Sequence, residues 1–140
     1  MAWRKLTEED LVAALSRDEV EAYRRDFESD PVPALLAQTA NWARGYIRTN
    51  GLVRMDPTPE TLPESCVGPA IDYTVIAILK RLMIEPNETR AQARQDAITY
   101  FRDISAGKNR PEDFDTAATE QQMVAAAPAF SPPKPERLLD

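Results

Sequence analysis

The sequence predicts an all-α protein, a small bundle of about five helices with a long proline-rich loop and an extended C-terminal arm. Apolar residues recur at helical spacing in successive segments between positions 7 and 107. Capping boxes and glycine stops separate these segments from one another. Five of the twelve prolines lie in 109–140, where the helical pattern ends. We therefore expect a helical domain over 1–108 and a flexible arm over 109–140.

Two short helices are expected near the N-terminus. Thr7 is a good N-cap, and the acidic residues 8–10 suit the positive end of a helix dipole. Ser16 and Glu19 form a capping box that predicts a second helix, which we expect to reach Phe27. Two such helices could also form a helix-turn-helix motif. The second one is rich in acidic residues and lacks the Asn or Gln that reads base edges, so DNA reading is disfavoured.

A third helix is expected to begin at Pro31, which is tolerated in a first helical turn, and to run to Arg48. Asn50-Gly51 then supplies a left-handed stop. The segment 51–66 is predicted to be a long loop, because its prolines break any regular period. Loops of this length are often functional or contact a partner. The prolines are Pro57, Pro59 and Pro63.

Residues 70–84 are apolar on nearly every face, a pattern typical of a buried helix. A strand is the rival interpretation of the β-branched run 74–78, but the length favours a helix, with Pro69 either kinking it or marking its first turn. So small a domain has difficulty burying the whole segment, so we expect part of it to contact a neighbouring subunit. The residues expected in this contact are Ile71, Val75, Ile78 and Leu82.

The last helix is expected to start at the N-cap Asn87 and to stop at Gly107. The arm that follows has two interpretations. It is either a fraying terminus or a segment that becomes ordered on a neighbouring subunit. In the second interpretation its apolar anchors are Phe130, Leu138 and Leu139.

The sequence shows no set of side chains that indicates catalysis. There is no histidine, and Cys66 is the only cysteine, which excludes an intramolecular disulfide and a Cys/His zinc site within one chain. The acidic clusters lack EF-hand spacing, and the four glycines form no phosphate loop. We therefore predict no enzyme activity, no catalytic residue, no metal and no cofactor.

Charge and hydropathy restrict the partners. The net charge of −6 argues against binding nucleic acid by neutralising its phosphates. The longest apolar run, 75–79, is far too short to span a bilayer, and residues 1–6 are not followed by the apolar stretch of a signal peptide. We expect a soluble protein made inside the cell, without a membrane partner.

Four motifs occur in an order that matches one known family. They are Thr-Glu-Glu-Asp-Leu at 7–11, a helix with small residues and a terminal aromatic at 40–46, a Leu-Pro entry at 62–63 into an apolar helix, and Asp-Ile-Ser-Ala-Gly-Lys at 103–108. In this order the chain resembles the head–tail connector (adaptor) proteins of tailed bacteriophages, in particular the small family of Mu-like phages and prophages. Ser-Pro-Pro at 131–133 is a fainter match in the arm.

The resemblance implies a structural virion protein at the head–tail junction, made in the cytoplasm of the bacterial host. Copies would form a homo-oligomeric ring beneath the portal protein, extend the DNA channel and dock a tail or stopper protein. Genomic DNA would pass without specific binding, and the acidic balance would suit a wall that repels phosphates. A bacterial helical interaction or regulatory module without a virion role is the main alternative. A DNA-binding regulator and an enzyme are the least favoured ones.

Overall fold

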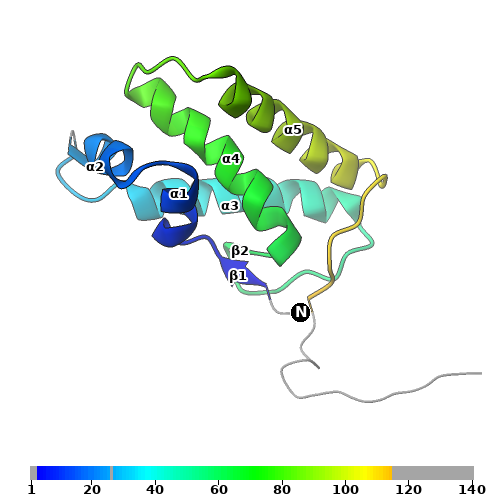
Figure 1. Cartoon of the computed structure of the whole chain (residues 1–140). Helices are drawn as coiled ribbons and strands as arrows, with labels where there is room; N and C mark the ends of the chain where they lie inside the picture. The colour runs from blue at the N-terminus through cyan, green and yellow to red at the C-terminus, as the bar shows by residue number, and fades with distance from the viewer. Residues whose placement is uncertain (1–2, 26, 115–140) are drawn as a thin grey trace, which may run out of the picture.

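The computed structural model describes residues 3–25 and 27–114, and in this part of the chain five helices form a bundle with one short sheet at its edge (Figure 1). This confirms the predicted all-α bundle. The strands were not expected; they pair antiparallel, with Arg4 opposite Leu62 and Lys5 opposite Thr61. The elements in chain order are β1 (Arg4–Lys5), α1 (Glu8–Ala14), α2 (Arg17–Arg25), α3 (Val32–Asn50), β2 (Thr61–Leu62), α4 (Glu64–Arg81) and α5 (Glu88–Ser105).

The predicted caps start the first two helices. The Thr7 hydroxyl accepts a hydrogen bond from the Asp10 backbone amide at 3.3 Å, and the Asp10 carboxylate accepts one from the Thr7 amide at 2.9 Å. Ser16 and Glu19 make the same reciprocal pair before α2, with both bonds at 3.1 Å. Each pair satisfies two amides that a helix start would otherwise leave unbonded. Helix α2 ends at Arg25, slightly before the predicted end at Phe27.

Helix α4 starts at the predicted Leu-Pro entry but ends earlier than expected. It begins at Glu64 and ends at Arg81, before the predicted end at Ile84. Pro69 falls inside the helix, which shows that it does not mark the first turn. Pro63 has extended backbone (φ −63°, ψ 152°) and stands directly before the first helical residue. The predicted entry at 62–63 is thereby confirmed.

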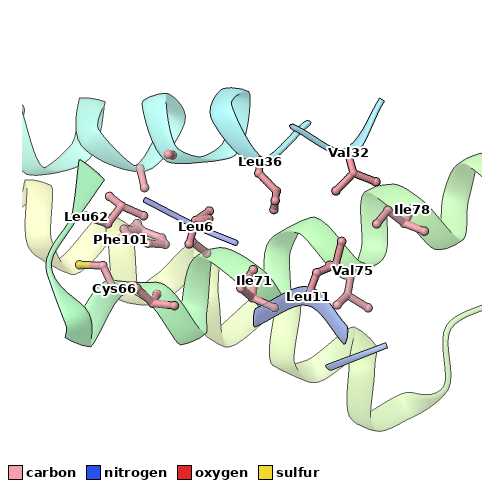
Figure 2. Close-up of a cluster of buried hydrophobic side chains, with 14 of the residues drawn as sticks. Leu6, Leu11, Val32, Leu36, Leu62, Cys66, Ile71, Val75, Ile78 and Phe101 are labelled. Carbon is pink, nitrogen blue, oxygen red and sulfur yellow. The ribbon is translucent and has the colours of Figure 1, made fainter. Parts of the chain in front are cut away.

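The core lies around α4, which runs through the middle of the bundle and packs against α1, α3 and α5 (Figure 1). Figure 2 shows side chains from α4 pointing toward Leu11 of α1, Leu36 of α3 and Phe101 of α5. At the edge of this core, Trp42 of α3 stacks on Tyr73 of α4 with ring centroids 4.0 Å apart. The α4 side chains that are almost fully buried are Cys66, Val67, Ala70, Ile71, Thr74, Val75, Ile78 and Leu79.

A buried arginine holds the long loop between α3 and α4. The Arg44 guanidinium donates hydrogen bonds to the Thr61 carbonyl at 2.9 Å and to the Asp56 carbonyl at 2.8 Å. It also lies 5.8 Å from the centre of the Trp3 ring. A buried guanidinium needs such acceptors because its desolvation is costly. The loop is therefore part of the folded body and connects α3 to the N-terminal segment.

The predicted boundary after Lys108 is wrong for residues 109–114, which pack on the body. Trp3 Nε1 donates to the Glu112 carbonyl at 3.1 Å, and the Phe114 amide donates to the Arg54 carbonyl at 2.7 Å. Pro111 is buried. The helical pattern ends at Gly107 as expected, but the chain continues across the N-terminal segment and the long loop. The remainder of the predicted arm, 115–140, lies outside the described residues.

These contacts predict different stabilities for two truncations. A chain that ends after Phe114 keeps every contact described above, whereas one that ends after Lys108 leaves Trp3 Nε1 and the Arg54 carbonyl without their partners. We expect the shorter chain to lose about 2 to 4 kcal/mol in the free energy of unfolding relative to the longer one. Urea unfolding followed by circular dichroism would measure this. Equal stability of the two chains would show that residues 109–114 contribute nothing to the body.

Candidate interaction site

The one cysteine is placed for packing and not for chemistry. Cys66 is fully buried, and burial raises the pKa of its thiol to about 12. At neutral pH the group is therefore protonated and is a poor nucleophile. Within residues 3–25 and 27–114, no three His, Cys, Asp or Glu side chains gather closely enough to hold a metal ion. In the same part of the chain, every helix is too short or too polar to cross a membrane.

The structure corrects the expectation that the apolar segment leaves surface free for a neighbouring subunit. Ile71, Val75 and Ile78 are at most 4% exposed, because α1, α3 and α5 together cover α4. Leu82 is half-buried against the same core. Sequence alone overestimated the free surface because it did not show that a helix as short as α1 reaches α4. The other predicted contact residues, Phe130, Leu138 and Leu139, lie outside the described residues.

Exposed apolar side chains instead gather where α4 turns into α5. Met83 is 93% exposed and Ile84 is 42% exposed. Together with Lys80 and Glu85 they border a depression of about 530 Å³. We call these four residues the α4–α5 corner. The run Leu-Met-Ile directly before a Glu-Pro-Asn helix start could have revealed this corner in the sequence, because the helix pattern has to end there.

Met83 occupies a backbone position that usually belongs to glycine. Its φ is +59°, its amide donates to the Lys80 carbonyl at 3.1 Å, and the Ile84 amide donates to the Leu79 carbonyl at 2.9 Å. These two bonds form a Schellman motif, the helix ending that normally has glycine at its left-handed position. Helix α5 ends in the same motif with Gly107 (φ +83°). Met83 thus adopts a strained backbone conformation, although its side chain remains almost fully exposed.

A second surface lies at the other end of α4, between that helix and α1. It is a groove of about 380 Å³ whose floor is formed by small or buried apolar residues and whose rim is charged. Gly68 leaves it open, since a Cβ added there would meet no atom within 4 Å. We call this surface the α1–α4 groove. Its lining residues are Arg4, Asp10, Ala13, Ala14, Glu64, Val67, Gly68, Ile71 and Asp72.

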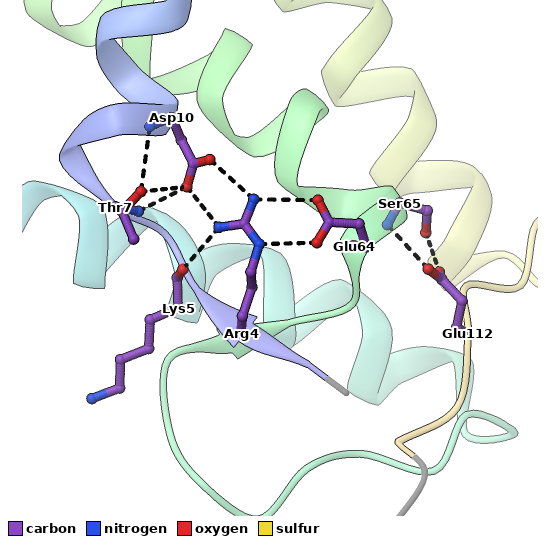
Figure 3. Close-up of polar contacts among 7 residues, drawn as sticks. All are labelled: Arg4, Lys5, Thr7, Asp10, Glu64, Ser65 and Glu112. Atoms are coloured by element: carbon purple, nitrogen blue, oxygen red, sulfur yellow. Dashed lines mark hydrogen bonds and ion pairs between the residues drawn. The ribbon is translucent and has the colours of Figure 1, made fainter. Parts of the chain in front are cut away.

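One end of the groove carries two ion pairs that share a single guanidinium, as Figure 3 shows. The Arg4 guanidinium lies between two carboxylates, with Nη1 2.8 Å from Asp10 Oδ2 and Nε 2.9 Å from Glu64 Oε1. The hydrogen bonds from Arg4 lower the pKa of Asp10 to about 2. Beside this pair, Glu112 accepts hydrogen bonds from the Ser65 amide and hydroxyl and so joins residues 109–114 to the start of α4. This network connects β1, α1, α4 and the segment after α5.

The other end of the groove carries the carboxylate of Asp72. Among the described residues, Asp72 makes no side-chain hydrogen bond and no ion pair, although it is half-buried. Burial, followed by the nearby charge of Asp96, raises the pKa of its carboxyl group. A carboxylate in this position gains from any cation that approaches the groove.

Comparison of the chain with family models, with curated proteins and with solved structures finds no match.

The ion pair at the groove predicts a pH-dependent stability. The pKa of Asp10 is lower in the folded chain than its ordinary value of 3.8. The ionised Asp10 carboxylate therefore stabilises the folded chain fully above pH 3.8, and this stabilisation is lost as the pH falls through about 2. We expect Asp10→Asn to reduce the free energy of unfolding by about 1 kcal/mol at pH 7, since water partly screens the pair, and by much less near pH 2.

Glu9→Gln is the matched control, because it removes one charge from an exposed position in the same helical turn. Urea unfolding of the full chain at several pH values would compare the two variants. A constant difference between the Asp10 variant and the parent chain from pH 7 to pH 2 would contradict this account.

Proposed function

We propose that the chain is a structural subunit of a head–tail connector, which assembles with copies of itself into a ring beneath the portal of a tailed bacteriophage. In this role it extends the DNA channel and docks a tail or stopper protein. The virion's head–tail junction is then its place of action, after synthesis in the host cytoplasm.

The observation that carries the proposal is the order of the four family-like motifs, three of which fall on junctions of the fold, while the fourth, at 40–46, lies inside α3. The Thr-to-Leu motif at 7–11 starts α1, the Leu-Pro motif at 62–63 leads into α4, and the motif at 103–108 ends α5. These residues cap and connect helices. Motifs that determine only the fold are what we expect in a structural subunit.

Two further observations support the same role. The described residues contain an exposed apolar corner, and such surface on a small domain favours a protein contact. The chain also has a net charge of −6, which suits a wall that DNA passes without adhering.

Assembly on a portal ring is the direct test. We expect the full chain, mixed with the portal protein of the same genome, to give a complex with a mass of several added copies in light scattering. Negative-stain images should show one added ring. A chain that stays monomeric both alone and with the portal, at concentrations up to about 100 μM, would exclude the connector role at any useful affinity.

A duplex-binding assay at low salt separates the remaining functions. The acidic connector subunit should not bind DNA, whereas a DNA-binding regulator should bind with a steep salt dependence. Failure to assemble with the portal, together with absence of DNA binding, would favour the alternative of a bacterial interaction or regulatory module.

A further inference from the structure

We propose that the α4–α5 corner of one copy docks into the α1–α4 groove of the next copy, so that a second copy of this chain is the partner of both surfaces. This inference depends on the proposed ring and assigns the residues that form its contact.

The backbone conformation of Met83 at the corner costs free energy, and packing within the isolated subunit does not offset this cost. A left-handed conformation costs a residue with a Cβ about 1 kcal/mol or more, which glycine avoids. Gly107 avoids this cost at the end of α5, whereas α4 has Met83 in the same motif. With 93% of its surface exposed, Met83 gains little from packing within its own chain. Burial in another copy would supply the missing gain, since a buried methionine contributes about 1.5 to 3 kcal/mol.

The groove beside Gly68 is an empty space that packing within the isolated chain does not explain. Gly68 lies inside α4, where glycine costs about 1 kcal/mol relative to alanine. No neighbouring atom of the described chain requires a glycine there. The space above it, bordered by Ala13 and Ala14, is open to an apolar side chain such as that of Met83.

The two surfaces offer one pair of opposite charges, Lys80 at the corner and Asp72 in the groove. The groove rim carries the carboxylates of Asp10, Glu64 and Asp72 against the single guanidinium of Arg4. The corner carries exposed Lys80 beside Glu85, and Arg81 follows it, with its guanidinium 4.9 Å from the centre of the Phe27 ring. When Met83 enters the groove, Lys80 is the cation available to Asp72. Opposite charges at the rim of a contact set its orientation and suppress wrong pairings.

The positions of the surfaces make the contact intermolecular and head-to-tail. Met83 and Gly68 lie at opposite ends of α4, about 20 Å apart along the helix axis. One copy therefore cannot fill its own groove, and each copy offers one corner and one groove. Contacts of this kind form rings when the rotation between neighbours closes.

Disulfide trapping tests the pairing. In the full chain, Met83→Cys combined with Gly68→Cys should give a ladder of covalent dimers, trimers and higher oligomers on mild oxidation in the portal-bound state. Neither single variant should give a ladder, and a mixture of the two single variants should give dimers only. Buried Cys66 can remain in all variants.

Leu52→Cys combined with Gly68→Cys is the matched control. Leu52 is also an exposed apolar residue, 70% exposed, but it follows α3 and is not part of the corner. No ladder is expected from it. Dimers from Met83→Cys alone would indicate a two-fold corner-to-corner contact and would overturn the proposal, as would a ladder from the Leu52 pair and none from the Met83 pair.

Three further substitutions distinguish docking from folding. Met83→Gly should stabilise the isolated chain, because it relieves the left-handed methionine, while weakening assembly about tenfold or more.

Lys80→Glu and Asp72→Lys should each weaken assembly about tenfold, and their combination should restore it to within about threefold of the parent chain. Assembly on the portal without these effects would overturn the proposed contact and leave the connector role standing. Absence of any assembly would overturn both.

Discussion

The structure depends on the burial of one helix from three sides. Helix α4 is apolar around most of its circumference, and a chain in water has to cover such a surface. Helices α3 and α5 cover two sides, and α1 covers a third. The remaining elements serve this arrangement. Arg44 holds the long loop against α3, and Arg4 connects β1 and α1 to the start of α4.

This burial determines where a partner can bind. Ile71, Val75 and Ile78 are used within the subunit, and the two candidate surfaces for a neighbour lie toward the two ends of the helix. One end is the exposed corner at Met83, where the chain accepts a strained conformation for a residue that its own core does not use. The other is a groove beside Gly68 with the carboxylate of Asp72, which has no ion-pair partner among residues 3–25 and 27–114. A subunit with unlike surfaces at opposite ends of one rigid helix is suited to head-to-tail assembly.

Local signals predicted the helices and long-range contacts corrected their boundaries. Capping boxes at Thr7 and Ser16 depend on residues three positions apart, so the sequence contains the whole interaction. The pairing of β1 with β2 and the docking of Glu112 on Trp3 join residues far apart in the chain, and no local pattern encodes them. The exposed corner was missed for another reason: an apolar run was taken to continue the helix, whereas the Schellman motif ends it at Leu82 and turns Met83 outward.

Hydrogen exchange of the full chain tests most directly whether α4 is the core of each subunit or an interface between subunits. If it is the core, the amides of residues 70–79 exchange only through global unfolding in the free chain. Their protection then equals the free energy of unfolding and does not increase when the chain assembles. Faster exchange in α4 than in α5 of the free chain, with strong slowing of α4 on assembly, would contradict the account and return α4 to the role of a subunit contact.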